Sequence, residues 1–244
     1  MRYTRAASER VRIRETGGAN VRVLTPISVL LALTFSGASL AQGWIKYTNE
    51  ADRFIVNFPR EPEMRETTYQ SEYGVTLPAR VYIAEEPPGT YFVTVVDYSD
   101  AESGHEELSA QTGSVYTHFT VPGELNGAVA FAAWNLRKRG GEITYDAWSS
   151  MDGVPGHQLQ IRNENQSRKF VAIHRLDRLL YILEGTVPGS SAPPVQFQQS
   201  LGFLDEEGKR ASYEYDEDGQ RFRVETSYEW IGVEDPITGE VRPE

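Results

Sequence analysis

Hydrophobic and polar positions alternate with a period of two through the first half of the chain beyond residue 41. Over residues 53–58, Phe54, Val56 and Phe58 share one face, and Pro59, which cannot donate to a sheet ladder, follows them. Successive side chains of a strand point to opposite faces, so this pattern predicts strands with one buried face. The strands predicted in this half cover residues 44–47, 53–58, 65–69, 79–83 and 91–98.

Helical periodicity interrupts the strands in the middle of the chain. Residues 122–139 carry an apolar stripe at helical spacing, which predicts a helix ended by Gly140 and Gly141. A capping box from Ser103 to Glu106 predicts an earlier helix, which Gly113 interrupts. A third, short helix is expected to open at 191–194 and to end at Gly208. It would place Phe197, Leu201 and Leu204 on one face.

Strand patterns return after residue 141. They cover residues 142–148, 157–162, 169–174 and 178–184, and the last two form a hairpin around Asp177. Runs of antiparallel strands with a few interposed helices indicate an α+β fold. We therefore predict a single twisted antiparallel sheet flanked by two or three helices.

The two ends of the chain differ in composition from the middle. Residues 1–41 predict a signal peptide, residues 42–208 the α+β domain, and residues 209–244 an acidic C-terminal extension. Residues 205–244 hold 13 acidic and 5 basic residues. Tyr213, Tyr215, Phe222 and Val224 alternate around an acidic turn, which predicts a β-hairpin followed by a flexible tail.

The first 41 residues have the three parts of a secretory signal. Six arginines precede an apolar stretch at 27–35, and small residues at Ser39 and Ala41 predict cleavage before Gln42. The alternative is an uncleaved N-terminal anchor. With cleavage, the protein would be periplasmic or secreted and would keep no permanent transmembrane span.

Charge and cysteine content narrow the function classes. The 244-residue chain has a net charge of −11, which becomes −15 without residues 1–41, because that segment holds six arginines and two glutamates. An acidic surface lacks the basic footprint that nucleic acid requires. The absence of cysteine excludes disulfides, thiolate metal sites and a cysteine nucleophile.

Short motifs resemble a known group of exported bacterial proteins. Trp44 and Tyr47, followed by a Phe58-Pro59-x-x-Pro62 element, resemble proteins with a fold like the photosystem extrinsic subunit P (PsbP-like) group. The stretches 141–146 and 197–201 are similar to uncharacterised exported proteins of alphaproteobacteria. The resemblance covers about residues 44–208 and implies a helix-flanked antiparallel sheet. It also implies a role in binding or assembly, and it carries over no catalytic residue.

Four titratable residues of the strands are candidates for acid–base chemistry. Asp97 and Asp146 lie inside otherwise apolar strands, and His157 and His174 lie on neighbouring ones. A hydrolase would need these side chains to converge in one cleft. The alternative is that each is an ordinary residue on a solvent-facing side of its strand. The chain beyond residue 41 has no serine-hydrolase elbow, phosphate loop or zinc-ligand spacing.

The acidic extension contains the spacing of a calcium-binding loop. Glu214, Asp216, Asp218 and Glu225 occupy loop positions 1, 3, 5 and 12, with Gly219 at position 6. Position 1 is usually Asp, and no helical pattern flanks the loop. The competing interpretation is a hairpin with its turn at Asp218-Gly219. A weak calcium site is therefore the only cofactor hypothesis, and otherwise no cofactor is expected.

The sequence favours an exported, non-catalytic protein of the cell envelope. Such a protein would bind or assist an unknown protein or envelope component. A hydrolase with a non-local acid–base site and a weak calcium-dependent module are the two alternatives.

Overall fold

The computed structural model describes residues 43–224, so the predicted signal peptide, its Ala41–Gln42 cleavage point and the predicted C-terminal tail lie outside the described residues. The described residues form twelve strands and three helices. The strands are β1 (Ile45–Asn49), β2 (Phe54–Phe58), β3 (Glu63–Gln70), β4 (Thr76–Glu86), β5 (Gly89–Asp97), β6 (Glu142–Met151), β7 (Val154–Arg162), β8 (Arg168–Leu176), β9 (Leu179–Val187), β10 (Gly202–Leu204), β11 (Arg210–Tyr215) and β12 (Arg221–Val224). The helices are α1 (Ala101–Thr112), α2 (Thr120–Lys138) and α3 (Val195–Gln198). Among them, no helix has the length and hydropathy needed to span a bilayer.

Seven strands form the larger sheet, in the order β3-β4-β5-β9-β8-β7-β6. All of its neighbouring strands are antiparallel. The predicted hairpin around Asp177 is confirmed as the β8–β9 connection, where Leu176 pairs with Leu179. Strands β3, β4 and β5 form one half of the sheet, and strands β6 to β9 form the other. The two halves are joined where β5 pairs with β9 along its length.

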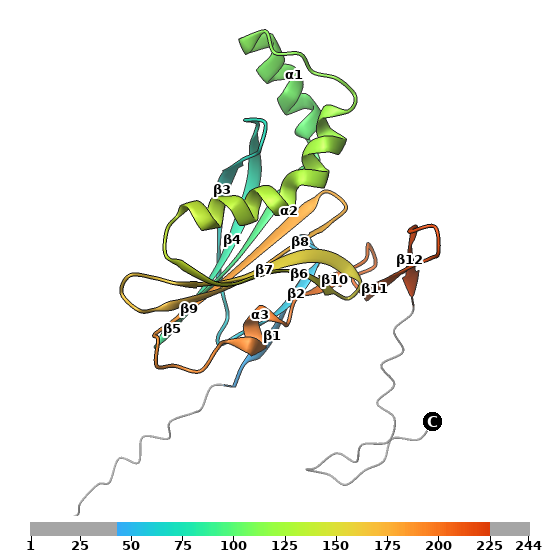
Figure 1. Cartoon of the computed structure of the whole chain (residues 1–244). Helices are drawn as coiled ribbons and strands as arrows, with labels where there is room; N and C mark the ends of the chain where they lie inside the picture. The colour runs from blue at the N-terminus through green and yellow to red at the C-terminus, as the bar shows by residue number, and fades with distance from the viewer. Residues whose placement is uncertain (1–42, 225–244) are drawn as a thin grey trace, which may run out of the picture. The chain divides into compact units, whose positions relative to one another are not determined.

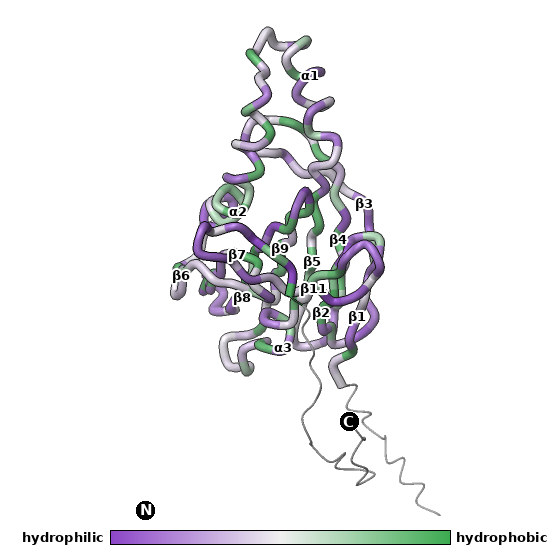
Figure 2. Tube along the Cα trace, turned by 90° about the vertical axis from the view of Figure 1, so that its right-hand side faces the viewer, coloured by the Kyte–Doolittle hydropathy of each residue, from purple (hydrophilic) through white to green (hydrophobic). Residues whose placement is uncertain are grey.

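The central strands of this sheet are buried on both faces, whereas the edge strands β3 and β6 are mostly exposed, and Figure 2 shows hydrophobic positions along β4 and β5. On β8, Val171 and Ile173 face one core, whereas Phe170 and Ala172 face the other. Helix α2 covers the face that carries Val171 and Ile173, whereas α1 projects beyond the β3–β4 end of the sheet (Figure 1) and contributes the buried Ala101 to the same core. The helix predicted at 122–139 is confirmed as α2.

A second sheet covers the other face, so the prediction of a single sheet flanked by helices is wrong. This sheet has the order β1-β2-β10-β11-β12, and α3 packs beside it. The apolar side chains of β2, including Phe54 and Phe58, pack against the larger sheet rather than extending it. The alternation of β2 indicated one buried face, but it did not specify which sheet the strand joins.

The third predicted helix is also shorter than its pattern implied. Helix α3 ends at Gln198, and Leu204, expected on its face, lies in strand β10. Here β10 pairs with β2, and Ser200 Oγ accepts a hydrogen bond of 2.8 Å from the Asn57 backbone N–H. Residues 202–204 therefore form a strand because they pair with β2, and they do not continue α3.

The C-terminal extension begins as part of this second sheet. Strand β11 pairs with β10 on one side and with β12 on the other, which confirms the predicted hairpin. Ion pairs from Arg223 to Asp205 and from Arg210 to Asp152 hold the hairpin against neighbouring turns. The Asp152–Arg210 pair links the β6–β7 turn of the larger sheet to the second sheet.

A buried carboxylate joins the two sheets. Asp52, in the β1–β2 turn, is fully buried. Both of its carboxylate oxygens accept hydrogen bonds of 2.7 Å from Arg80 Nε on β4, and Tyr82 Oη also donates to it. Tyr181 Oη on β9 donates to the Asp52 carbonyl at 3.0 Å. Burial and the adjacent carboxylate raise the pKa of Tyr82, so its hydroxyl remains a donor.

We expect Asp52→Ala to lower the free energy of unfolding by about 3 kcal/mol, because removing one partner leaves the buried donors without an acceptor. Urea unfolding followed by circular dichroism measures the change. The control is Glu63→Ala, which breaks an exposed Glu63–Arg65 pair and should leave the midpoint unchanged. Equal midpoints for both variants would show that the Asp52 network does not hold the sheets together.

Candidate binding site

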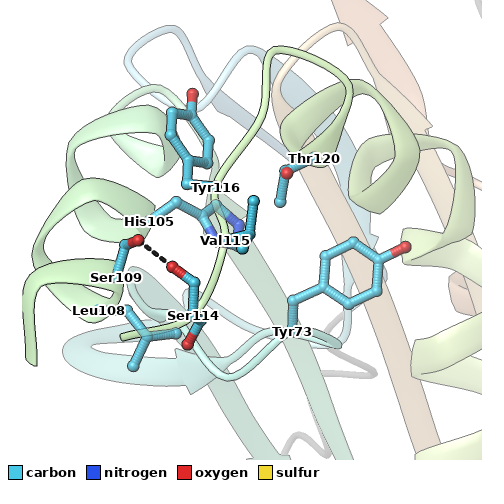
Figure 3. A pocket seen from close by; sticks show the side chains of 8 residues that line it. All are labelled: Tyr73, His105, Leu108, Ser109, Ser114, Val115, Tyr116 and Thr120. Atoms are coloured by element: carbon cyan, nitrogen blue, oxygen red, sulfur yellow. Dashed lines mark hydrogen bonds between the residues drawn. The ribbon is translucent and has the colours of Figure 1, made fainter. Parts of the chain in front are cut away.

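A cavity lies where α1, the start of α2 and the β3–β4 turn meet. Its volume is about 250 Å³. Figure 3 shows the side chains that surround it, which come from these three segments and from the loop between α1 and α2. The lining residues are Tyr73, His105, Leu108, Ser109, Ser114, Val115, Tyr116 and Thr120. We call residues 71–75 and 101–120 the α1 region.

Glu124 holds the three segments of this pocket together. Its side chain is fully buried on α2. Oε2 lies 2.9 Å from Nε2 of His105 on α1, and Oε1 accepts a hydrogen bond of 3.1 Å from the backbone N–H of Tyr73 in the β3–β4 turn. A buried carboxylate is tolerated only with such partners. Glu124 therefore fixes the turn and α1 against α2.

His105 stands between two tyrosines at the pocket. Its ring stacks on Tyr116 with 5.7 Å between centroids and a 9° interplanar angle. The Tyr73 ring lies 6.3 Å away on a tilted plane. A carboxylate can only accept, so a proton on Nε2 of His105 completes this contact when Glu124 is ionised. The imidazole is thus held in one orientation by its carboxylate partner and by aromatic packing.

Small residues allow α1 to pack closely on the β3–β4 turn. A Cβ at Gly104 would lie 2.4 Å from Cγ1 of Val75, so only glycine fits there without a shift. Gly113 ends α1 in the left-handed conformation, with φ of 72°. The Ser109 hydroxyl then donates to the Ser114 carbonyl, which ties the following loop to the helix.

The predicted capping box at the start of α1 is wrong. The helix begins at Ala101, with Asp100 as its N-cap residue, and no side chain caps it. Ser103 and Glu106 consequently lie inside the helix. The Ala101 side chain is fully buried in the helix-side core, and packing of this residue explains the earlier start.

Two exposed apolar side chains line the pocket, and a third, Phe119, precedes the lining residue Thr120 in the chain. Val115 is 86% exposed, Phe119 71% and Tyr73 47%. Contiguous apolar groups that remain in water mark interaction surfaces, whereas single ones need no explanation.

The α1 region is acidic as well as apolar. It holds four glutamates, at 72, 102, 106 and 107, and no lysine or arginine. Glu102 is neutralised by Arg178, with 2.8 Å between carboxylate and guanidinium. Glu72, Glu106 and Glu107 are exposed. None of these glutamates lines the pocket, to which α1 contributes the face of His105, Leu108 and Ser109.

Two of the four predicted acid–base residues meet elsewhere. Asp146 Oδ1 on β6 lies 2.5 Å from Nε2 of His157 on β7, and Arg137 of α2 donates to both Asp146 oxygens at 2.7 and 2.8 Å. The Arg137 hydrogen bonds, assisted by His157, lower the pKa of Asp146 to about 2. The exposed Trp148 packs edge-on against His157.

The other two lie apart from this cluster and from each other. Asp97 lies 3.8 Å from Arg80, beside the Asp52 network. His174 pairs with Gly156, one position from His157, so the two histidines point to opposite faces of the sheet. His174 is fully buried beside Phe203, and burial lowers its pKa to about 4. Asp97, Asp146, His157 and His174 do not form one cleft.

The residues of the calcium-loop spacing belong to the β11–β12 hairpin. Glu214 lies in β11 opposite Phe222. Asp216 Oδ1 accepts hydrogen bonds from the backbone N–H groups of Asp218 at 3.0 Å and Gln220 at 2.7 Å. Glu225 lies outside the described residues. Within residues 43–224, no group of three or more acidic or histidine side chains is placed to hold a metal ion.

The sequence contains a signal for the Glu124 site, which is a charged residue on the apolar stripe of α2. Glu124 falls three residues after Val121 and four before Ala128, on the buried stripe of α2. A charged residue on such a stripe must have a partner. Which partner it has depends on the β3–β4 turn and α1, which are distant in sequence.

Comparison with known proteins adds no family assignment: no protein-family model and no curated protein matches this sequence.

We expect Glu124→Gln to loosen the α1 region while the two sheets stay folded. The amide keeps one acceptor oxygen, so it cannot accept hydrogen bonds from both His105 and the Tyr73 N–H. Amide hydrogen exchange at residues 72–74 and along α1 should accelerate by about tenfold or more. The matched control, Glu106→Gln on the exposed face of α1, should leave exchange unchanged. Unchanged protection in Glu124→Gln would contradict the role of Glu124.

The Asp146–Arg137 contact predicts a pH dependence. The folded-state pKa, about 2, lies below the ordinary value of 3.8. The ionised carboxylate therefore stabilises the fold above about pH 4, and this contribution is lost as the pH falls through about 2. Arg137→Gln should raise the Asp146 pKa toward its ordinary value, measured by carboxyl carbon NMR titration. Arg162→Gln, which removes the separate pair with Glu142, is the control. An Asp146 pKa that stays near 2 in Arg137→Gln would refute this account.

Proposed function

We propose that the chain is an exported, non-catalytic binding protein of the cell envelope, periplasmic or secreted, whose partner docks on the α1 region. One observation carries the proposal: Tyr73 and Val115 are exposed apolar side chains that line a pocket whose walls Glu124 holds in place, and the exposed Phe119 precedes the lining residue Thr120. Ordering exposed apolar groups around a fixed cavity before binding reduces the entropy cost of association.

The geometry of the pocket supports binding more than catalysis. The Glu124 carboxylate is fully buried, so its described contacts serve to position His105 and the β3–β4 turn. The pocket offers two tyrosine rings, three hydroxyl groups and aliphatic surface. Tyrosine and hydroxyl groups of this kind are common in recognition surfaces.

The two alternatives rest on weaker geometry. A hydrolase built from Asp97, Asp146, His157 and His174 would need them in one cleft, and only Asp146 and His157 touch. A calcium-dependent module would need the Asp216 oxygens free, whereas Oδ1 of this residue holds the hairpin turn. Calorimetric titration with calcium at millimolar concentration distinguishes the calcium module from the proposal.

We also propose that the chain is related to the PsbP-like group of exported proteins. It is supported by the short motifs around Trp44 and Pro59, and it implies a binding or assembly role. The second sheet is a departure from the helix-flanked sheet that the kinship implies.

Site-specific photocross-linking tests the proposed docking surface. A photoreactive phenylalanine at position 119 should cross-link a partner in intact cells of the source bacterium. The same residue at position 64 should not, because the exposed Met64 lies on strand β3 at an edge of the larger sheet. The recovered protein should be periplasmic or secreted and should begin at Gln42. Equal cross-linking at both positions, or none at 119, would overturn the docking surface, and retention in the cytoplasm would overturn export.

A further inference from the structure

A histidine is enclosed between the two sheets. His174 lies on β8, where it pairs with Gly156 of β7 and with Tyr181 of β9. Its ring meets Phe203 of β10 at an angle of 65°, with 6.2 Å between centroids. A Cβ at position 156 would lie 2.2 Å from Nδ1 of His174, so the glycine leaves room for the ring. No part of His174 is exposed, and water therefore does not reach the imidazole in the folded protein.

The hydrogen bonding of His174 suits a neutral ring. Its Nδ1 atom lies 3.1 Å from the carbonyl oxygen of Val154 in β7. A carbonyl can only accept, so Nδ1 carries the proton. The Nε2 atom is buried and has no hydrogen-bond partner among the residues that the structure describes. Protonation would place a charge and a second N–H at this point without an acceptor, which is unfavourable in a buried site.

The surroundings of His174 do not offset a positive charge. Across β9, the titratable neighbour is Tyr181, whose hydroxyl donates to a backbone carbonyl. Strands β7 and β10 contribute backbone and apolar groups. The nearest turn carries Asp152, and its carboxylate is paired with Arg210. Burial therefore lowers the pKa of His174 to about 4, although hydrogen bonds to the β7 backbone oppose this effect.

The turn that precedes Val154 also holds the C-terminal hairpin. The carbonyl of Asp152 accepts a hydrogen bond of 2.9 Å from the Tyr213 N–H of β11. The Asp152 carboxylate lies 2.9 Å from the guanidinium of Arg210 on the same strand. A Cβ at Gly153 would lie 1.7 Å from the Tyr213 carbonyl oxygen, so the turn and β11 are in direct contact. A displacement of Val154 would consequently disturb the contact with β11.

The β11–β12 hairpin is more weakly held than the strand that carries the histidine. Strand β11 pairs with β10 over only two residues, and β12 pairs with β11 alone. Strand β8 is paired on both sides, with β7 and with β9. The ion pair from Arg221 to Asp177 also holds the hairpin, but it is at the surface, where such pairs contribute little. Opening of the hairpin therefore costs less free energy than separation of the strands of the larger sheet.

We propose that the chain carries an acid-sensitive switch: protonation of His174 opens the β6–β7 turn and releases the β11–β12 hairpin, while the larger sheet stays folded. Release uncovers the edge of β10 that β11 occupies, and an unpaired strand edge can accept another strand. The switch lies on the face of the larger sheet that the second sheet covers. It does not depend on the docking surface of the α1 region.

The direction of the pH effect follows from the pKa of His174 in the two states. The folded-state pKa of about 4 lies below the ordinary value of 6.5, which the imidazole regains when the open hairpin admits water. The neutral ring therefore stabilises the closed hairpin above about pH 6.5, and this contribution is lost as the pH falls toward 4. Between these values, the ratio of open to closed hairpins should rise by about tenfold for each pH unit.

Hydrogen exchange of the Tyr213 amide measures the opening, because this group donates to Asp152 in the closed hairpin. After correction for the intrinsic pH dependence of exchange, the opening ratio at Tyr213 should rise by about tenfold as the pH falls from about 6 to about 5. The amides of β8 and β9 should show no rise of this size. An equal rise in β8 and β9 would mean that acid unfolds the whole domain, which would overturn the inference.

Variants assign the effect to one side chain. The amide of H174N can still donate to the Val154 carbonyl but does not titrate, so Tyr213 exchange should lose its pH dependence even if the hairpin opens more often at every pH. The control H118N replaces an exposed histidine and should keep the dependence. R210Q removes the partner of Asp152 and should also keep it. Persistence of the dependence in H174N, or its loss in R210Q, would overturn the role of His174.

A titration of the unmodified protein gives a test that does not rely on the folding of a variant. The imidazole of His174, followed by NMR, should titrate well below the exposed His118. Equal midpoints for the two rings would show that burial does not keep His174 neutral, and would overturn the inference.

Discussion

The fold depends on the burial of one carboxylate between two sheets. Asp52 comes from the turn that starts the small sheet, and the groups that satisfy it come from the large one. A carboxylate removed from water at this point requires donors, and Arg80 and Tyr82 provide them. Tyr181 adds a hydrogen bond to the Asp52 backbone. The apolar core between the sheets, to which Phe54 belongs, supplies buried surface, whereas the polar network fixes the position of the β1–β2 turn.

A second buried carboxylate joins distant segments on the side of the large sheet that the helices pack against. Glu124 is as buried as Asp52, and it too joins segments that are distant in sequence. The consequence differs, because the segments joined by Glu124 enclose a cavity instead of a packed core. The β3–β4 turn, α1 and the loop after it would each be weakly fixed alone. The attachment of the β3–β4 turn and α1 to Glu124 gives the pocket a defined shape, and Ser109 ties the following loop to α1.

The polar cluster around Asp146 and the α1 region differ in how their charged side chains are paired. Around Asp146, an arginine, a histidine and an exposed tryptophan satisfy one another, so the Asp146–His157–Arg137 contacts stabilise the approach of α2 to the sheet edge. In the α1 region, the exposed glutamates Glu106 and Glu107 have no basic residue of the same region beside them. Val115 and Phe119 of the same region are exposed, so apolar surface of the α1 region stays in contact with water.

The sequence by itself determined most of the secondary structure, because alternation with period two and the apolar stripe of 122–139 reflect local geometry. It also indicated the β8–β9 and β11–β12 hairpins through their turn residues. Only the tertiary structure decided that β2 joins a second sheet, since alternation reports one buried face and not its neighbour. The same holds for the site. Asp146 and His157 meet while His174 points away, because one position along a strand reverses the face. Glu124 connects these segments only because His105 and Tyr73, about 20 and 50 positions away in the chain, fold against it.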